Sequence, residues 1–140
     1  MLQYSTLARN AMLDAIQYGA NSGQTRGIGE SAIIKLWTGS MPANCALADS
    51  GTMIAELDLA PSWASDASAG VKSFTFGRVV AVAPGTLGFF RIYASDGISC
   101  HMQGTITEPG GGGVMIIDGA DMAWGQGITF AGFIIRAHGA

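Results

Sequence analysis

The sequence predicts an all-β fold, a jelly-roll-like antiparallel β-sandwich with one N-terminal α-helix. Short runs of alternating apolar and polar residues recur along the chain and are separated by turn-rich segments, which is typical of sandwiches and barrels. Glycine contributes 21 of the 140 residues, which favours many turns over a helical bundle. The long connections between the runs favour crossings between two sheets over simple hairpins.

The length of 140 residues indicates a single domain. We expect residues 1–29 to form a helix and a connector, and residues 30–140 to form the sandwich. Charged residues make up only 12% of the chain, against roughly 25% in soluble domains. The surface is therefore expected either to consist largely of small polar residues or to be buried in part against other chains.

Composition also argues against several classes of protein. The net charge is −3 and there is no basic run, which argues against nucleic acid as a partner. Neither a membrane-spanning apolar run nor a secretory signal is visible, so we expect no membrane partner and a reducing compartment. The two cysteines, Cys45 and Cys100, form neither a disulfide framework nor a zinc spacing, and we expect no metal and no cofactor.

One helix is predicted over Tyr4–Ala20, with Ser5 or Thr6 as its N-cap. Its apolar residues recur at i, i+3 and i+4 and form one stripe: Tyr4, Leu7, Ala8, Ala11, Met12, Ala15, Ile16 and Ala20. The other side is polar and carries Arg9, Asn10, Asp14 and Gln17. The stripe can cover the sandwich or contact another molecule, and the sequence leaves both placements open. A flexible connector, Ala20–Gly29, is expected to follow.

The next strands alternate clearly. Ser31–Thr38 places Ala32, Ile34 and Leu36 on one face. Thr52–Ala60 is expected to turn four residues inward, namely Met53, Ala55, Leu57 and Leu59, and the residues between them outward, Ile54 included. Long loops follow these two strands, at Gly39–Gly51 and Pro61–Gly70. Val71–Ala83 is predicted to hold one or two strands around Gly77.

The central prediction is a β-hairpin over Thr86–Thr105, because two alternating runs flank Ser95-Asp96-Gly97. A three-residue loop with Gly97 in the left-handed region separates apolar from polar residues, whereas a two-residue loop mixes them. The predicted core face carries Phe90, Ile92, Ala94, Ile98, Cys100, Met102 and Gly104. The predicted outward face carries Phe89, Arg91, Tyr93, Ser99, His101 and Gln103, a mixture that suits a contact surface.

The C-terminal part is predicted to be turn-rich. Gly110–Gly113 indicates a hinge or tight turn before a short strand at Val114–Ile117. After a loop, a last strand over Ile128–Ala137 is apolar on both faces. Such a strand is buried on both sides or pairs its outer face with a partner, which makes Phe133 and Ile135 candidate contact residues.

No catalytic arrangement is evident, and we expect the protein not to be an enzyme. Cys100 and His101 are neighbours on a strand and point to opposite faces, so they cannot jointly ligate a metal. A nucleophilic pair would need Cys45 to approach His101 from its distant loop. Glu56 and Asp58 share a strand face, but two outward acids are typical of a solvated surface.

Three stretches carry a resemblance: ARNAMLDAI (Ala8–Ile16), IIKLWTGSMPANCALADSGTMIAELDL (Ile33–Leu59) and GFFRIYASDGISCHMQGTI (Gly88–Ile106). This combination of a helix, an L-W-T-G-S-x-P-A-N-C motif and an F-R-I-Y-x-S-D-G motif resembles the head-decoration or capsid cement proteins of tailed bacteriophages. The resemblance is greatest to the jelly-roll cement proteins of podophages. The resemblance implies a jelly-roll sandwich that associates with itself, as a homodimer or with higher symmetry. It also implies binding across neighbouring subunits of the major capsid protein, on the virion exterior, after synthesis in the host cytoplasm.

The candidate contact residues for such a role are Leu7, Met12, Ile16, Phe89, Arg91, Tyr93, His101, Phe133 and Ile135. An alternative of a different class is a tail-associated or carbohydrate-binding β-sandwich module. Exposed aromatic residues would bind sugars in such a module, and Trp37, Trp63 and Trp124 are available.

Overall fold

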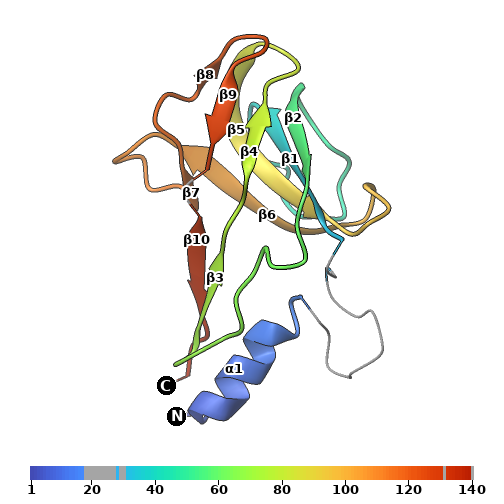
Figure 1. Ribbon diagram of the computed structural model, residues 1–140. Coiled ribbons are helices and arrows are strands. Elements are labelled where there is room, and N and C mark those ends of the chain that lie inside the picture. The colour runs from blue at the N-terminus through green and yellow to red at the C-terminus, as the bar shows by residue number, and fades with distance from the viewer. Residues whose placement is uncertain (18–27, 29–30, 131, 140) are drawn as a thin grey trace.

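The computed structural model describes residues 1–17, 28, 31–130 and 132–139 (Figure 1). In this part of the chain one helix accompanies sheets that are almost wholly antiparallel. The predicted all-β sandwich with an N-terminal helix is confirmed at this level, and the jelly-roll connectivity stays a prediction. The described residues contain no helix with the length and apolar character needed to cross a membrane.

The elements, in chain order, are α1 (Thr6–Asp14), β1 (Ile33–Thr38), β2 (Met53–Asp58), β3 (Val71–Phe74), β4 (Arg78–Val80), β5 (Gly85–Tyr93), β6 (Cys100–Thr107), β7 (Met115–Ile116), β8 (Asp121–Met122), β9 (Gly127–Thr129) and β10 (Phe133–Arg136). Helix α1 begins at Thr6 rather than at Tyr4, and Ser5, one of the two predicted N-caps, caps it: its hydroxyl accepts a hydrogen bond from the Ala8 amide at 3.2 Å. The helix ends at Asp14, earlier than predicted. Residues 18–20 and all of the predicted connector except Ile28 lie outside the described residues.

The largest sheet has the strand order β2-β1-β5-β6-β7, and β8 also pairs with β5. Its ladders are antiparallel except for the short parallel pairing of β6 with β7. Two ribbons accompany this sheet, one made of β3 and β10 and the other of β4 and β9. Figure 1 shows the β3–β10 ribbon extending toward α1 and both termini, with the β4–β9 ribbon at the opposite end of the molecule.

The core lies between the main sheet and the β3–β10 ribbon. Ile34 and Leu36 of β1 are buried as the alternation predicts, and Phe90 of β5 lies on the same side. The Phe90 ring packs against Phe133 of β10 at 5.4 Å between ring centroids, and Phe133 stacks on Phe74 of β3 at 4.8 Å. The aromatic rings therefore join the two layers.

Strand β2 departs from simple alternation at Ile54, which was predicted to face outward and is instead fully buried. The ladder with β1 pairs Leu36 with Ala55 and then Trp37 with Met53, so Ile54 is the extra residue of a β-bulge. The bulge rotates the strand locally and allows both Ile54 and Ala55 to enter the core.

The central hairpin forms, but the predicted register is wrong by two residues. Met102 lies opposite Ile92 rather than Phe90, and Cys100 lies opposite Tyr93 after a bulge. Gly97 adopts the predicted left-handed conformation with φ of 67°. The loop is wider than predicted because the Asp96 carboxylate accepts hydrogen bonds from the amides of Ile98 and Ser99 at 2.9 and 2.8 Å. Ile98 is exposed, and Cys100 moves from the predicted core face to the opposite one.

The predicted last strand is two strands in different ribbons, because β9 pairs with β4 whereas β10 pairs with β3. Gly132 lies so close to β3 that a Cβ atom there would meet the Phe74 carbonyl oxygen. The predicted strand over Ile128–Ala137 is therefore apolar on both faces because its two halves pair with different strands. The predicted turn at Gly110–Gly113 is confirmed, since Gly110 and Gly112 have positive φ angles.

Candidate functional site

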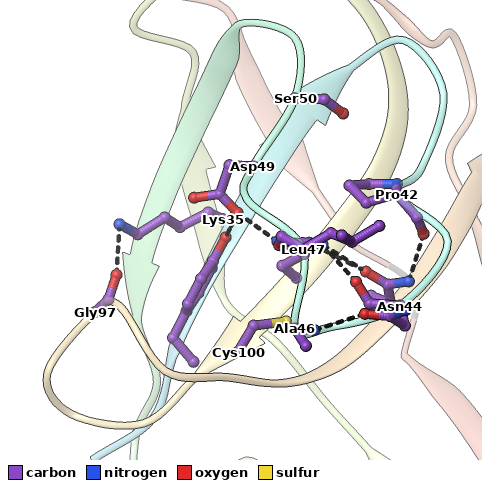
Figure 2. Close-up of polar contacts among 12 residues, drawn as sticks. Lys35, Pro42, Asn44, Ala46, Leu47, Asp49, Ser50, Gly97 and Cys100 are labelled. Atoms are coloured by element: carbon purple, nitrogen blue, oxygen red, sulfur yellow. Dashed lines mark hydrogen bonds and ion pairs between the residues drawn. The ribbon is translucent and has the colours of Figure 1, made fainter.

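The hairpin face that was predicted to be a contact surface is covered by the chain itself. Phe89, Arg91 and Tyr93 are all at most 1% exposed. Residues 39–51 cover Arg91 and Tyr93, and this segment is called the strap (Figure 2). Alternation distinguished the two faces of the strand correctly, but it could not show that a distant loop lies over the polar one.

Arg91 holds the strap in place. Its guanidinium donates to the carbonyl oxygens of Asn44 and Leu47 at 3.1 and 2.9 Å, and to the Asp49 carboxylate at 2.7 Å. It also donates twice to the Gln103 side-chain oxygen, and the Gln103 amide donates to the Pro42 carbonyl at 2.7 Å. One buried arginine thus satisfies strap oxygens that would otherwise be desolvated without partners.

Tyr93 and Phe89 complete this structural network. The Tyr93 hydroxyl donates to Asp49 at 2.5 Å, and Lys35 lies 4.9 Å from the centre of the Tyr93 ring. Burial, aided by the Asp49 carboxylate, raises the pKa of Tyr93 and keeps the phenol neutral. Phe89 stacks on Trp37 at 6.4 Å. These side chains stabilise the fold and are not available to a partner, so their assignment as contact residues is wrong.

The residues considered for chemistry do not converge in the described structure. His101 is exposed, and Gln103 lies opposite Arg91. Glu56 forms a salt bridge with Lys35 at 3.2 Å, as expected of a carboxylate on a solvated face. Among the described residues, no group of three or more His, Cys, Asp or Glu side chains could hold a metal ion.

The side of α1 that packs against the body carries buried Leu13 together with Asn10 and Asp14, whose polar side chains bind the loop beneath them. Asp14 accepts hydrogen bonds from the Ala67 amide and from the buried Lys72 ammonium, both at 2.8 Å. Asn10 accepts from the Gly70 amide at 2.8 Å, and Gln17 donates to the Pro61 carbonyl at 3.1 Å. The inward side of the helix therefore satisfies backbone groups of the loop at residues 61–70 that no strand pairs.

Part of the predicted apolar stripe is exposed on the side of the helix that faces away from the body, and Tyr4 is exposed just before the helix begins. Leu7 is 80% exposed, Met12 and Tyr4 are each more than 40% exposed, and Ala11 is exposed as well. These four residues, Tyr4, Leu7, Ala11 and Met12, are called the outer helix face. Leu2 precedes it and is 72% exposed. Contiguous exposed apolar side chains are typical of an interaction site.

Three other candidate contact residues lie largely inside the protein. Ile16 and Ile135 are partly buried and pack against the core, and Phe133 is a buried core residue. Ile16 falls outside the exposed stripe because the residues after Asp14 leave the helix and form a turn. Of the predicted contact residues, Leu7, Met12 and His101 are therefore the exposed ones.

A second exposed apolar surface lies at the end of the molecule opposite α1, where Figure 1 shows β4, β8 and β9. Val80, Val82 and Trp124 are exposed there and are called the tip patch. Hydrogen bonds join the two segments, from the Ala81 amide to the Gln126 carbonyl and from the Gly125 amide to the Ala81 carbonyl, both at 2.8 Å. The two valines lie in a segment without clear alternation, so the sequence pattern does not mark them as surface residues.

Comparison of the chain with protein-family models, with curated proteins and with solved structures finds no match. The resemblance of the three sequence stretches to capsid cement proteins therefore stays a prediction, and the structure contributes the two exposed apolar surfaces.

Proposed function

We propose that this protein is a virion structural protein of a tailed phage, which binds the outside of the capsid and stabilises it by bridging major capsid subunits. The observation that carries the proposal is the outer helix face, an apolar surface left exposed while the opposite side of the helix packs inward through Leu13, Asn10 and Asp14. A helix that only covered the sandwich would bury Leu7 and Met12 as well.

The outer helix face offers contact energy of a useful size. Fully burying a leucine or methionine side chain contributes about 1.5–3 kcal/mol. Leu7 retains most of its accessible surface in the free protein, so nearly all of that contribution is available to binding. Repetition of the same contact over many equivalent capsid sites raises the total stabilisation of the shell without requiring a tight single interface.

Bridging needs two contact surfaces, and the molecule offers them at opposite ends. The outer helix face lies at the end that carries the termini, and the tip patch lies at the other end (Figure 1). If each contacts a different capsid subunit, the protein binds the assembled lattice better than it binds free subunits. Preferential binding to the assembled state shifts the assembly equilibrium toward intact shells by mass action.

The test is co-sedimentation of the purified protein with capsids assembled without it, followed by a thermal or pressure challenge of the shells. We expect saturable binding and shells that withstand a harsher challenge once the protein is bound. A folded protein that stays in the supernatant at all shell concentrations would contradict a cement role.

A carbohydrate-binding module is the second candidate, and Trp124 supports it because its ring is 76% exposed. The other two tryptophans support it less, since Trp63 is buried and Trp37 is partly buried against Phe89. A glycan array separates the candidates: binding that is lost in a Trp124→Ala variant would favour the sugar-binding function.

A further inference from the structure

The strap brings together two cysteines that are far apart in the sequence. Cys45 lies in the strap and Cys100 is the first residue of β6; both are free thiols and partly exposed. The Cys45 side chain is close enough to hydrogen-bond to the Cys100 thiol. Figure 2 agrees with this contact, since Cys100 lies beside the part of the strap that carries Ala46, the next residue after Cys45.

The surrounding contacts fix both cysteines. Arg91 binds the carbonyl oxygens of Asn44 and Leu47, which lie on either side of Cys45. On the other side of the contact, the bulge in the hairpin places Cys100 opposite Tyr93, on the face that the strap covers. The Cys100 thiol also donates to the Met102 carbonyl at 3.5 Å. The approach of the two sulfur atoms thus follows from the same network that closes the strap.

We propose that Cys45 and Cys100 form an intramolecular disulfide when the protein meets a small-molecule disulfide such as oxidised glutathione, and that this bond locks the strap onto β6. A thiolate of one cysteine attacks the glutathione disulfide, forming a mixed disulfide and releasing one reduced glutathione. The thiolate of the other cysteine then attacks the protein sulfur of that mixed disulfide and releases the second glutathione. The two protein thiols are oxidised, two glutathione thiols are formed, and two protons pass from the protein to the leaving thiolates.

The order of the two attacks follows from the environment of Cys100. Burial, together with the contact to Cys45, raises the pKa of Cys100 to about 12, so Cys100 supplies little thiolate at neutral pH. We therefore expect Cys45 to attack the oxidant and Cys100 to resolve the mixed disulfide. The rate of closure is expected to rise with pH, because the resolving step needs the Cys100 thiolate.

The proposed bond is independent of the capsid-binding proposal, because it concerns one chain and a soluble oxidant. Its structural effect is to replace a strap held by hydrogen bonds with one held covalently. Local opening of the strap, which requires the Arg91 contacts to break in the reduced protein, is then restricted at Cys45.

The test treats the reduced full-length protein with oxidised glutathione and measures its intact mass, its free thiols and its cross-linked peptides. We expect a monomer that has lost two hydrogen atoms, has no free thiol and yields a Cys45–Cys100 peptide. Cleavage within the strap by a protease should slow by about tenfold or more on oxidation. The matched variants Cys45→Ser and Cys100→Ser should form no cross-linked peptide and show no such slowing, and Cys100→Ser should stop at the mixed disulfide of Cys45 with glutathione.

Two results would overturn the proposal. One is a wild-type protein that gains glutathione at its cysteines without forming the cross-linked peptide. The other is a covalent dimer as the main product. Because the wild-type protein alone gives the decisive mass and peptide readouts, the test does not depend on the folding of either serine variant.

Discussion

Replacing Arg91 with methionine should release the strap. Methionine keeps an unbranched side chain at this position. It provides none of the hydrogen bonds to Asn44, Leu47 and Asp49. Arg91 is 1% exposed, so its side chain is shielded from water in the closed structure. The variant therefore leaves the strap oxygens that Arg91 binds without their donor unless the strap opens.

The size of the effect follows from the burial of the ion pair. Removing one partner of a buried pair costs about 3–5 kcal/mol. The Asp49 side chain is 34% exposed, so water can rehydrate its carboxylate once the strap loosens. We therefore expect a loss near the lower end, about 3 kcal/mol in the free energy of unfolding.

The assay is urea unfolding followed by tryptophan fluorescence, combined with limited proteolysis of the strap. Arg136→Met serves as the matched control, because Arg136 lies exposed on β10. We expect the Arg91→Met variant to unfold at lower urea and to be cleaved first within residues 39–51. An unchanged midpoint, with a strap as resistant as in the wild-type protein, would refute the role given to Arg91.

Three further predictions concern the strap and the helix. Phe89→Ser should lower the free energy of unfolding by about 3–5 kcal/mol in urea titrations because Phe89 is fully buried. An unchanged free energy of unfolding would contradict the burial of Phe89 and favour its prediction as a contact residue. Asp14→Ala should cost about 3 kcal/mol and increase hydrogen exchange in α1 first, since it breaks the contact with buried Lys72; exchange as slow as in the wild type would contradict the docking. The pKa of Tyr93 is raised from 10.0 in the folded state, so its contribution to stability is fully present below pH 10 and is lost as the pH rises further. Urea titrations above pH 10 should therefore show a steeper loss for wild type than for Tyr93→Phe, and parallel curves would argue against a buried phenol.

Local alternation predicted well those elements whose neighbours in sequence are also their neighbours in space. The inward face of β1, with Ile34 and Leu36, follows directly from its period of two. The left-handed Gly97 of the hairpin follows from the Asp-Gly pair. Each of these features depends on residues within a few positions of one another.

The errors arose where distant segments meet. The inward side of α1 carries Asn10 and Asp14 beside buried Leu13 because backbone amides of Ala67 and Gly70 need acceptors, and helical periodicity contains no information about that loop. Arg91 is buried because a strap of turn residues supplies its acceptors. In both places a polar side chain satisfies the backbone of an irregular segment, and the hydrophobic pattern alone assigns such a side chain to solvent.

The bulges explain the remaining differences. Ile54 and Cys100 each lie next to an irregularity in a ladder, and each changes the face that simple alternation assigns to it. The contact between Cys45 and Cys100 follows from the second bulge and from the path of the strap. A spacing rule for cysteines could not have found it.

The most direct test of the proposed function compares shell binding by a Leu7→Ser/Met12→Ser variant with binding by the wild-type protein. Ile98→Ser is the matched control, since Ile98 is an exposed apolar residue on the hairpin loop. Loss of two apolar contacts worth about 1.5–3 kcal/mol each should weaken binding to cement-free capsids by a factor of roughly 100 or more, with the fold intact by circular dichroism. The control should bind as the wild type does. Equal binding by all three proteins would contradict the assignment of the outer helix face as the capsid-binding surface.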